Sequence, residues 1–236
     1  MGQIKELKTM KIFNKIVVCL VTLAIFPIMY FMNIVRAVVS ISEYSSLYTI
    51  LSKLAEKTAS SAMEITFSVK EIFKYISDGS FSFGGMKFDI SKIPAELLSG
   101  KNWAIAAGIL IVIALIIAIV IIGCALFTNA YKTITALGAG GAVCCFAALR
   151  CFAGFSSPYI NGSVDIGEIL AKAFVGESNN LLGSIGTSIL KGAISVDLFT
   201  LGNAVTLSLI FFIGIALWEL AYVVTLPEKK PTKAKK

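Results

Sequence analysis

The sequence predicts an all-α integral membrane protein with four transmembrane helices and an extracytoplasmic cap made of amphipathic helices and one short β-hairpin. Residues 103–127 read WAIAAGILIVIALIIAIVIIGCALF without a single charge. As a helix this stretch is about 37 Å long, more than the roughly 30 Å of a bilayer's hydrocarbon core. Mean hydropathy is +0.86 and 57% of the residues are apolar. A single soluble core cannot bury so much apolar surface, so lipid has to cover the excess.

The chain begins with a basic segment that precedes the first predicted span. Residues 1–15 contain four lysines and one glutamate, and we expect them to lie in the cytoplasm. Residues 16–39 form an apolar run that is longer than the apolar region of a signal peptide, and no small-residue cleavage site follows it. The sequence therefore predicts an uncleaved transmembrane helix at 16–39.

Residues 40–101 form a polar segment that we expect on the outer side of the membrane. Within it, apolar residues recur every three to four positions over 43–77, which is typical of an amphipathic helix. This helix either binds a partner or the membrane surface, or it packs on the second outer loop of the same chain.

A β-hairpin is predicted at 80–90, where apolar and polar residues alternate about Gly84 and Gly85. A two-residue hairpin turn needs positive φ angles, which glycine adopts readily. A lone hairpin is marginal in water, so its aromatic face must rest on the preceding helix or on a neighbouring subunit. Pairing about this turn puts four candidate oligomer-contact residues on one face, with Phe81 opposite Phe88 and Phe83 opposite Met86.

The second and third predicted spans differ in their side chains. The second, 103–127, carries large aliphatic residues around its whole circumference and is expected to face lipid. After a cytoplasmic turn at 128–132, the third span, 133–155, is dominated by small residues that let helix backbones approach closely. It is either the central packing helix of the bundle or a helix that lines a pore or acts as a hinge. The candidate packing residues are Gly138, Gly141, Ala142 and Cys145.

A second outer loop, the fourth span and a basic tail complete the chain. Residues 156–200 contain signals for two short helices, 165–174 and 178–190, and the latter either packs over the bundle or enters the membrane as a re-entrant element. Residues 201–226 form the fourth span. The tail, 227–236, holds five lysines with no aromatic residue among them, so its expected partner is anionic lipid and not nucleic acid.

Lysine placement predicts the orientation of the protein. The N-terminal segment, the turn at 128–132 and the tail hold ten lysines, whereas the two much longer outer loops hold nine. Cytoplasmic segments of membrane proteins carry the excess of lysine and arginine. We therefore expect a multi-pass protein of the plasma membrane with both termini in the cytoplasm.

Three ionisable residues fall within the predicted spans: Arg36, Arg150 and Glu219. Both arginines lie near the outer ends of their helices, where a long side chain can reach the headgroups. Glu219 lies closer to the inner end of the fourth span, and a carboxylate there has to be paired, hydrated or protonated. It either pairs with Lys15 or Lys132, or it serves as a proton or cation site.

The motif search predicts that the protein is not an enzyme and holds no metal or cofactor. The chain has no histidine, the commonest general base, and contains no phosphate-binding loop, nucleophile elbow or HExxH motif. Its five cysteines lie within or beside apolar runs and away from zinc-ligand spacing, so they are expected to be packing residues.

The order of four spans, cytoplasmic termini, a long first outer loop and a shorter second one resembles the general plan of claudins, connexins and innexins. Those families rely on paired cysteines in the outer loops, and this chain has none there, so no functional residue carries over. The leading hypothesis is a structural, pore-forming or junction-like subunit that forms a homo-oligomer through its outer cap and its small-residue helix. The alternatives are an accessory subunit of a larger transport or secretion complex, and a small proton-coupled transporter that uses Glu219.

Overall fold

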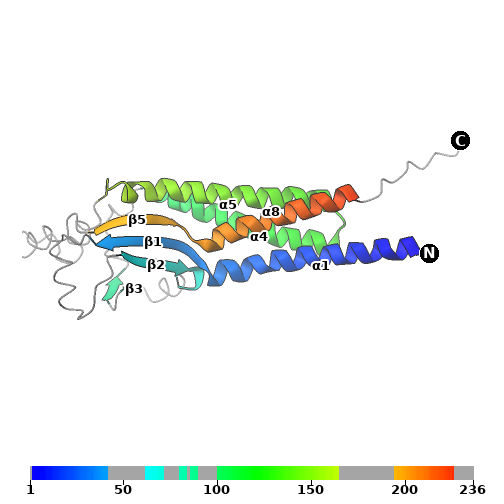
Figure 1. Ribbon diagram of the computed structural model, residues 1–236, viewed down its shortest axis with the longest axis horizontal. Helices are drawn as coiled ribbons and strands as arrows, with labels where there is room; N and C mark the ends of the chain where they lie inside the picture. The colour runs from blue at the N-terminus through cyan, green and yellow to red at the C-terminus, as the bar shows by residue number, and fades with distance from the viewer. Residues whose placement is uncertain are drawn as a thin grey trace, which may run out of the picture.

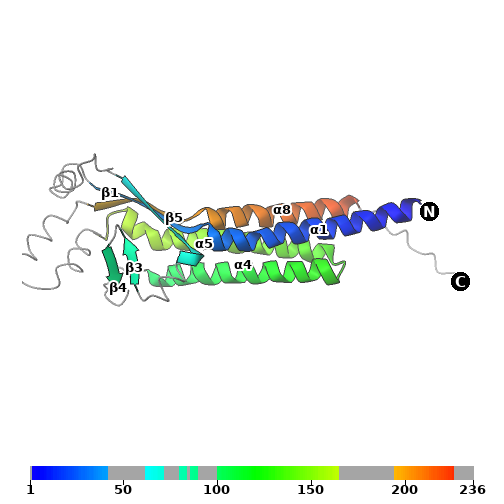
Figure 2. The same ribbon diagram turned by 90° about the horizontal axis from the view of Figure 1, so that it is seen from below.

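The computed structural model of the chain is built mainly from four long helices that run side by side (Figure 1, Figure 2). Each is long and apolar enough to cross a membrane, so the fold is compatible with a multi-pass membrane protein. The helices are α1 (Gly2–Phe31), α4 (Lys101–Phe127), α5 (Tyr131–Ile160) and α8 (Asn203–Thr225). The structure describes residues 2–41, 62–71, 80–83, 86–89, 100–164 and 194–225.

Helix α1 differs from the predicted first span at both ends. It begins at Gly2, so the basic segment 1–15 belongs to the same helix, and it ends at Phe31 instead of continuing to residue 39. Strand β1, Asn33–Ile41, follows it. Valine and isoleucine are frequent in this strand, and their branched side chains favour extended structure when a partner strand is available. An apolar run alone does not distinguish a buried strand from the end of a spanning helix.

A three-stranded sheet corrects the predicted all-α class. Strands β2 (Ala62–Ser68) and β5 (Ile194–Leu201) flank β1 in the order β2-β1-β5, and both pairings are antiparallel. Strand β2 lies inside the segment 43–77, for which one amphipathic helix was predicted, and that prediction is wrong for these residues. Apart from residues 69–71, the rest of that segment lies outside the described residues.

The sequence of β2 carries the signal for a strand. From Met63 to Ser68 the strand alternates apolar and polar residues with the period of two that a strand requires. Ser68 ends the strand and caps a helix that begins at residue 69. Its hydroxyl accepts a hydrogen bond from the Glu71 N–H at 3.2 Å, while the Glu71 carboxylate accepts one from the Ser68 N–H at 2.7 Å. This reciprocal capping box explains why the chain changes from strand to helix at Ser68.

The predicted hairpin is present. Strands β3 (Ser80–Phe83) and β4 (Met86–Asp89) pair antiparallel on either side of the glycine pair. Their register is the predicted one, with Phe81 opposite Phe88 and Phe83 opposite Met86.

The other three helices overlap the predicted spans with shifted ends. Helix α4 starts at Lys101, just before the predicted second span, and ends with it at Phe127. Helix α5 continues to Ile160, into the predicted second outer loop. Helix α8 starts at Asn203 because Leu201 is the last residue of β5. The short helices predicted at 165–174 and 178–190 lie outside the described residues.

Helices α4 and α5 pack along narrow stripes in which small side chains predominate. Helix α5 lies against both α4 and α8, and α1 contacts α4 and α8. Alanine supplies most of the buried residues of α4, which lets neighbouring helices approach closely: Ala107, Ala114, Ala118, Ile121 and Ala125. Large aliphatic side chains such as Ile109, Val112 and Ile116 are exposed on the same helix, which is the surface that lipid would cover.

The strands and the chain-terminal helix ends occupy opposite ends of the molecule. Figure 1 and Figure 2 show the sheet and the hairpin at one end. The first turns of α1, the last turns of α8 and the α4–α5 connection at 128–130 lie at the other. The strands, the start of α4 and the end of α5 therefore lie at the same end of the bundle.

Phe199 of β5 fixes the sheet to the end of α5. Its ring centroid lies 5.2 Å from that of Phe152, 5.6 Å from that of Phe155 and 5.7 Å from that of Tyr159. Aromatic pairs at such separations contribute about 0.5–1.5 kcal/mol each beyond their buried area. Because β5 pairs directly with β1, this aromatic cluster ties the sheet to the helical bundle.

Candidate functional site

Two polar side chains face each other across the interface between α1 and α8. Helix α1 buries a stripe that begins with Asn14 and continues through Val18, Thr22, Ile25 and Met29, at helical spacing. Helix α8 buries a matching stripe of Ser208, Phe212, Ile215, Glu219 and Tyr222. Asn14 is 1% exposed and Glu219 is 0% exposed, so both groups are removed from solvent.

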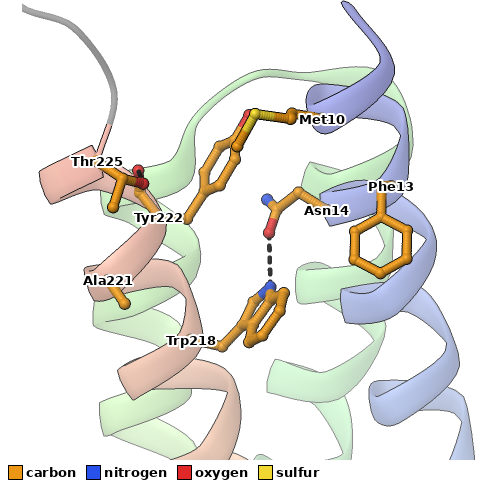
Figure 3. Close-up of a pocket in the computed structure, with 7 residues that line it drawn as sticks. All are labelled: Met10, Phe13, Asn14, Trp218, Ala221, Tyr222 and Thr225. Carbon is orange, nitrogen blue, oxygen red and sulfur yellow. Dashed lines mark hydrogen bonds between the residues drawn. The ribbon is translucent and has the colours of Figure 1, made fainter. Parts of the chain in front are cut away.

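Asn14 is held by two neighbouring residues of α8. Its Nδ2 donates a hydrogen bond to Oε1 of Glu219 at 2.9 Å. Its Oδ1 accepts a hydrogen bond from Nε1 of Trp218 at 2.7 Å (Figure 3). The amide thus joins the two helices through both of its ends, and its orientation follows from these two partners.

Two buried oxygens beside this amide have no hydrogen-bond partner: Oε2 of Glu219 and the hydroxyl oxygen of Tyr222. A buried carboxylate with a single neutral donor is costly to keep charged, because it has lost its hydration. The free Oε2 is the atom at which Glu219 can hold a proton or contact a cation. The Tyr222 hydroxyl can donate to an acceptor that neither helix supplies.

Tyr222 also connects the site to the start of α5. Its ring packs edge-on against Tyr131, with centroids 5.0 Å apart and planes at 68°. The Tyr131 hydroxyl donates to Oδ1 of Asn129 at 3.3 Å, in the α4–α5 connection. Asn14, Glu219 and this tyrosine pair therefore lie at the end of the bundle that carries the α4–α5 connection.

A groove opens beside Asn14 between the two helices, with a volume of about 260 Å³. Its walls are largely apolar, and Figure 3 shows its lining side chains projecting from both helices. We call it the α1–α8 groove; its lining residues are Met10, Phe13, Asn14, Trp218, Ala221, Tyr222 and Thr225.

The three predicted intramembrane charges are not brought together. Glu219 is bonded to Asn14, and neither Lys15 nor Lys132 forms the ion pair that was the alternative interpretation. Arg36 lies in β1 and not in a helix, and its Nε is 2.7 Å from Oε1 of Glu64 on β2.

Arg150 is exposed on α5. Its guanidinium lies over the ring of Phe146, 5.3 Å from the ring centroid, four residues earlier on the same helix. This cation–π contact orients the side chain along the helix surface. Arg150 takes no part in the cluster around Glu219.

The small residues of α5 pack against α8 of the same chain. A Cβ added at Gly138 would lie 3.0 Å from the backbone nitrogen of Ala216, and one at Gly141 would lie 2.5 Å from the ring of Phe212. Ala142 and Cys145 are also buried. All four candidate packing residues are therefore buried within the chain, or close to α8 of the same chain. Of Phe81, Phe83, Met86 and Phe88, the structure describes only the backbone pairing.

Asn14 and Tyr222 were not among the residues singled out in the sequence. Asn14 falls in the segment assigned to a cytoplasmic N-terminus, although it begins the helical spacing 14, 18, 22, 25 and 29 that α1 buries. Tyr222 follows Glu219 by three residues, which places both on one face of a helix. These two spacings, one in each helix, are the features of the sequence from which Asn14 and Tyr222 could have been identified.

Among the described residues, no group of three or more cysteine, aspartate or glutamate side chains could hold a metal ion. Comparison of the chain with protein-family models, with curated proteins and with solved structures finds no match.

Proposed function

We propose that the protein is a structural or pore-forming subunit of the plasma membrane that self-associates through the end that bears its strands. Its termini lie in the cytoplasm. The orientation is supported by the arrangement of the helices: the N-terminal end of α1, the C-terminal end of α8 and the start of α5 share one end. Lys5, Lys8, Lys11 and Lys15 of α1 and Lys132 of α5 belong to that end, in agreement with the positive-inside rule.

The observation that carries self-association is the edge position of β2. In the order β2-β1-β5, strand β2 has β1 on one side and no strand partner on its other side among the described residues. An edge strand presents N–H and C=O groups that can pair with a strand of another chain. Strand β5, at the opposite edge, lies along α5 instead.

The small-residue surface of α5 is already covered by α8, which argues against a subunit contact through that part of the helical bundle. Gly138 and Gly141, the residues predicted to bring helices together, are already closed by Phe212 and Ala216 of the same chain. A second subunit cannot use that surface unless α8 leaves it. This occupied surface on α5 supports the assignment of self-association to the strands in our proposal.

Native mass spectrometry of the protein purified gently from its own membranes tests this proposal. A closed set of identical subunits is expected. Thr66→Glu, on β2, should lower the oligomer fraction, because charge on an edge strand opposes pairing. Thr200→Glu, on β5, is the matched control, since Thr66 and Thr200 both lie opposite Arg36 in the sheet.

A monomer would contradict self-association. A constant set of foreign subunits would instead support the role of an accessory subunit in a larger transport or secretion complex. Equal loss of oligomer in both variants would show that the sheet, and not the β2 edge, had been damaged.

A second candidate function, proton-coupled transport, is favoured by the free Oε2 of Glu219. Glu219→Gln removes the proton-binding carboxylate but keeps an oxygen acceptor for Asn14. In proteoliposomes with a pH-sensitive dye inside, this variant should abolish a proton flux that the unaltered protein supports. Asp197→Asn, on the exposed surface of β5, should leave the flux unchanged. No flux from the unaltered protein would exclude this function.

A further inference from the structure

The α1–α8 groove has the shape and lining of a binding site for a narrow apolar group. Its volume of about 260 Å³ is just below the roughly 300–1,000 Å³ of pockets for drug-sized ligands. Met10 and Phe13 on one wall are both more than half exposed, so the groove is open along its side. A lipid chain could enter it laterally from the bilayer.

We propose that the α1–α8 groove binds one anionic phospholipid of the inner leaflet, with an acyl chain along the groove and the phosphate beside the lysines of α1. The proposal rests on the membrane orientation proposed above. It does not depend on self-association.

Charge favours an anionic headgroup over a zwitterionic one. No lysine lines the groove, but α1, which forms one of its walls, carries Lys5, Lys8, Lys11 and Lys15 against the single acidic residue Glu6. The only carboxylate on α8 is Glu219, which is buried and bonded to Asn14. The end of the bundle at which the groove lies therefore has an excess of positive charge, which attracts phosphate.

The polar atoms of the groove suit the interfacial part of a phospholipid. Tyr222 is 8% exposed, and its buried hydroxyl has no hydrogen-bond partner, although the residue lines the groove (Figure 3). An ester or phosphate oxygen would accept a hydrogen bond from it. Trp218 and Tyr222 lie near the end of the spanning helix, where tryptophan and tyrosine are enriched at the boundary between headgroups and acyl chains.

The two tryptophans allow a direct test, because they lie at opposite ends of the bundle. Trp218 lines the groove, whereas Trp103 is in the first turn of α4, at the end that bears the strands. In a Trp103→Phe variant, fluorescence reports on the groove alone. Dibrominated acyl chains quench tryptophan on contact. The full-length variant is placed in bilayers that contain brominated phosphatidylglycerol or, at the same mole fraction, brominated phosphatidylcholine.

The anionic lipid is expected to associate with the Trp218 site about fivefold more tightly than the zwitterionic one, the effect of roughly one basic residue beside an anionic headgroup. Ala221→Phe, which fills the groove, should remove this preference. Leu220→Phe is the matched control, because Leu220 is the exposed neighbour of Ala221 and does not line the groove. Equal quenching of Trp218 by both lipids, or a preference that survives Ala221→Phe, would overturn the proposal.

A second variant distinguishes a wrong lipid-site proposal from a wrong membrane assignment. In a Trp218→Phe variant, Trp103 reports on general contact with lipid, and its exposed ring should be quenched equally by both brominated lipids. If Trp103 is quenched while Trp218 shows no preference, the membrane assignment stands and only the lipid site is wrong. If neither tryptophan is quenched, the chain is not inserted in the bilayer and both proposals fail.

Discussion

Gly202→Ala is expected to destabilise the protein by about 3 kcal/mol or more, the upper part of the range for overpacked positions. Gly202 joins β5 to α8 and packs on Asn33, the first residue of β1 after α1. An alanine Cβ would overlap the carbonyl oxygen of Asn33 and lie 2.7 Å from its carbonyl carbon. Both atoms belong to the backbone, so no side chain can rotate to relieve the contact.

The same junction contains a short backbone hydrogen bond that the substitution would strain. The Gly202 N–H donates to the carbonyl oxygen of Ile34 at 2.6 Å. Moving Asn33 to admit a Cβ would also move Ile34, and with it the first pairs between β1 and β5. We therefore expect the loss of stability to include the sheet and not only the end of α8.

Unfolding of the detergent-solubilised variant by titration with a denaturing detergent measures the effect. Gly214→Ala is the control, because nothing lies within 4 Å of a Cβ built at that position of α8. It should leave the unfolding midpoint nearly unchanged. If Gly202→Ala unfolds at the same midpoint as Gly214→Ala, the close approach of the two helix–strand junctions is not present in the folded protein.

The four long apolar helices could be predicted because crossing a bilayer imposes a strong requirement on length and composition. Residues 103–127 are uncharged over a length that matches a bilayer, and α4 covers them. The first span was predicted to continue to residue 39, beyond the end of α1 at Phe31. The reason is that an apolar run such as Asn33–Ile41 satisfies the same requirement. Its extended form depends on pairing with β2 and β5, and β5 is more than 150 residues distant in sequence.

The hairpin and β2 show how local signals compete. The glycine pair at 84–85 predicts a two-residue turn and with it the register of the flanking strands, and the pairing of β3 with β4 confirms that register. For residues 62–68, the helix prediction rested on isolated apolar residues at helical spacing, although apolar and polar residues alternate there as in a strand. The capping box of Ser68 and Glu71, which marks the start of a helix, was also missed.

Glu219 could be identified as a candidate because burying a carboxylate costs free energy. Its hydrogen-bond partner could not be identified in the same way. The prediction considered only opposite charges, Lys15 and Lys132, whereas the structure uses the neutral amide of Asn14. An amide can donate to a carboxyl group whether that group is charged or protonated. The position of Asn14 at the start of the buried stripe of α1 becomes evident only once the helix is known to begin at Gly2.

Gly141→Ala is expected to cost about 1–3 kcal/mol, even though alanine normally stabilises a helix relative to glycine. The added Cβ would lie 2.5 Å from two ring carbons of Phe212, which is 0% exposed. Gly140→Ala is the matched control on the next residue, where the nearest atom is Ile117 Cδ1 at 3.9 Å. In unfolding by a denaturing detergent, the midpoint of Gly141→Ala should be clearly lower than that of Gly140→Ala.

A second substitution tests the cause of this effect. Phe212→Leu removes the ring that the new methyl group would strike, at the cost of a cavity in the unaltered background. In combination with Gly141→Ala, the methyl group and the smaller side chain should share the space, so the double variant should be more stable than the sum of the single effects predicts. Coupling of about 0.5–3 kcal/mol is expected for two residues in direct contact. Strictly additive effects would mean that Gly141 and Phe212 do not meet, and that α5 and α8 pack on different faces.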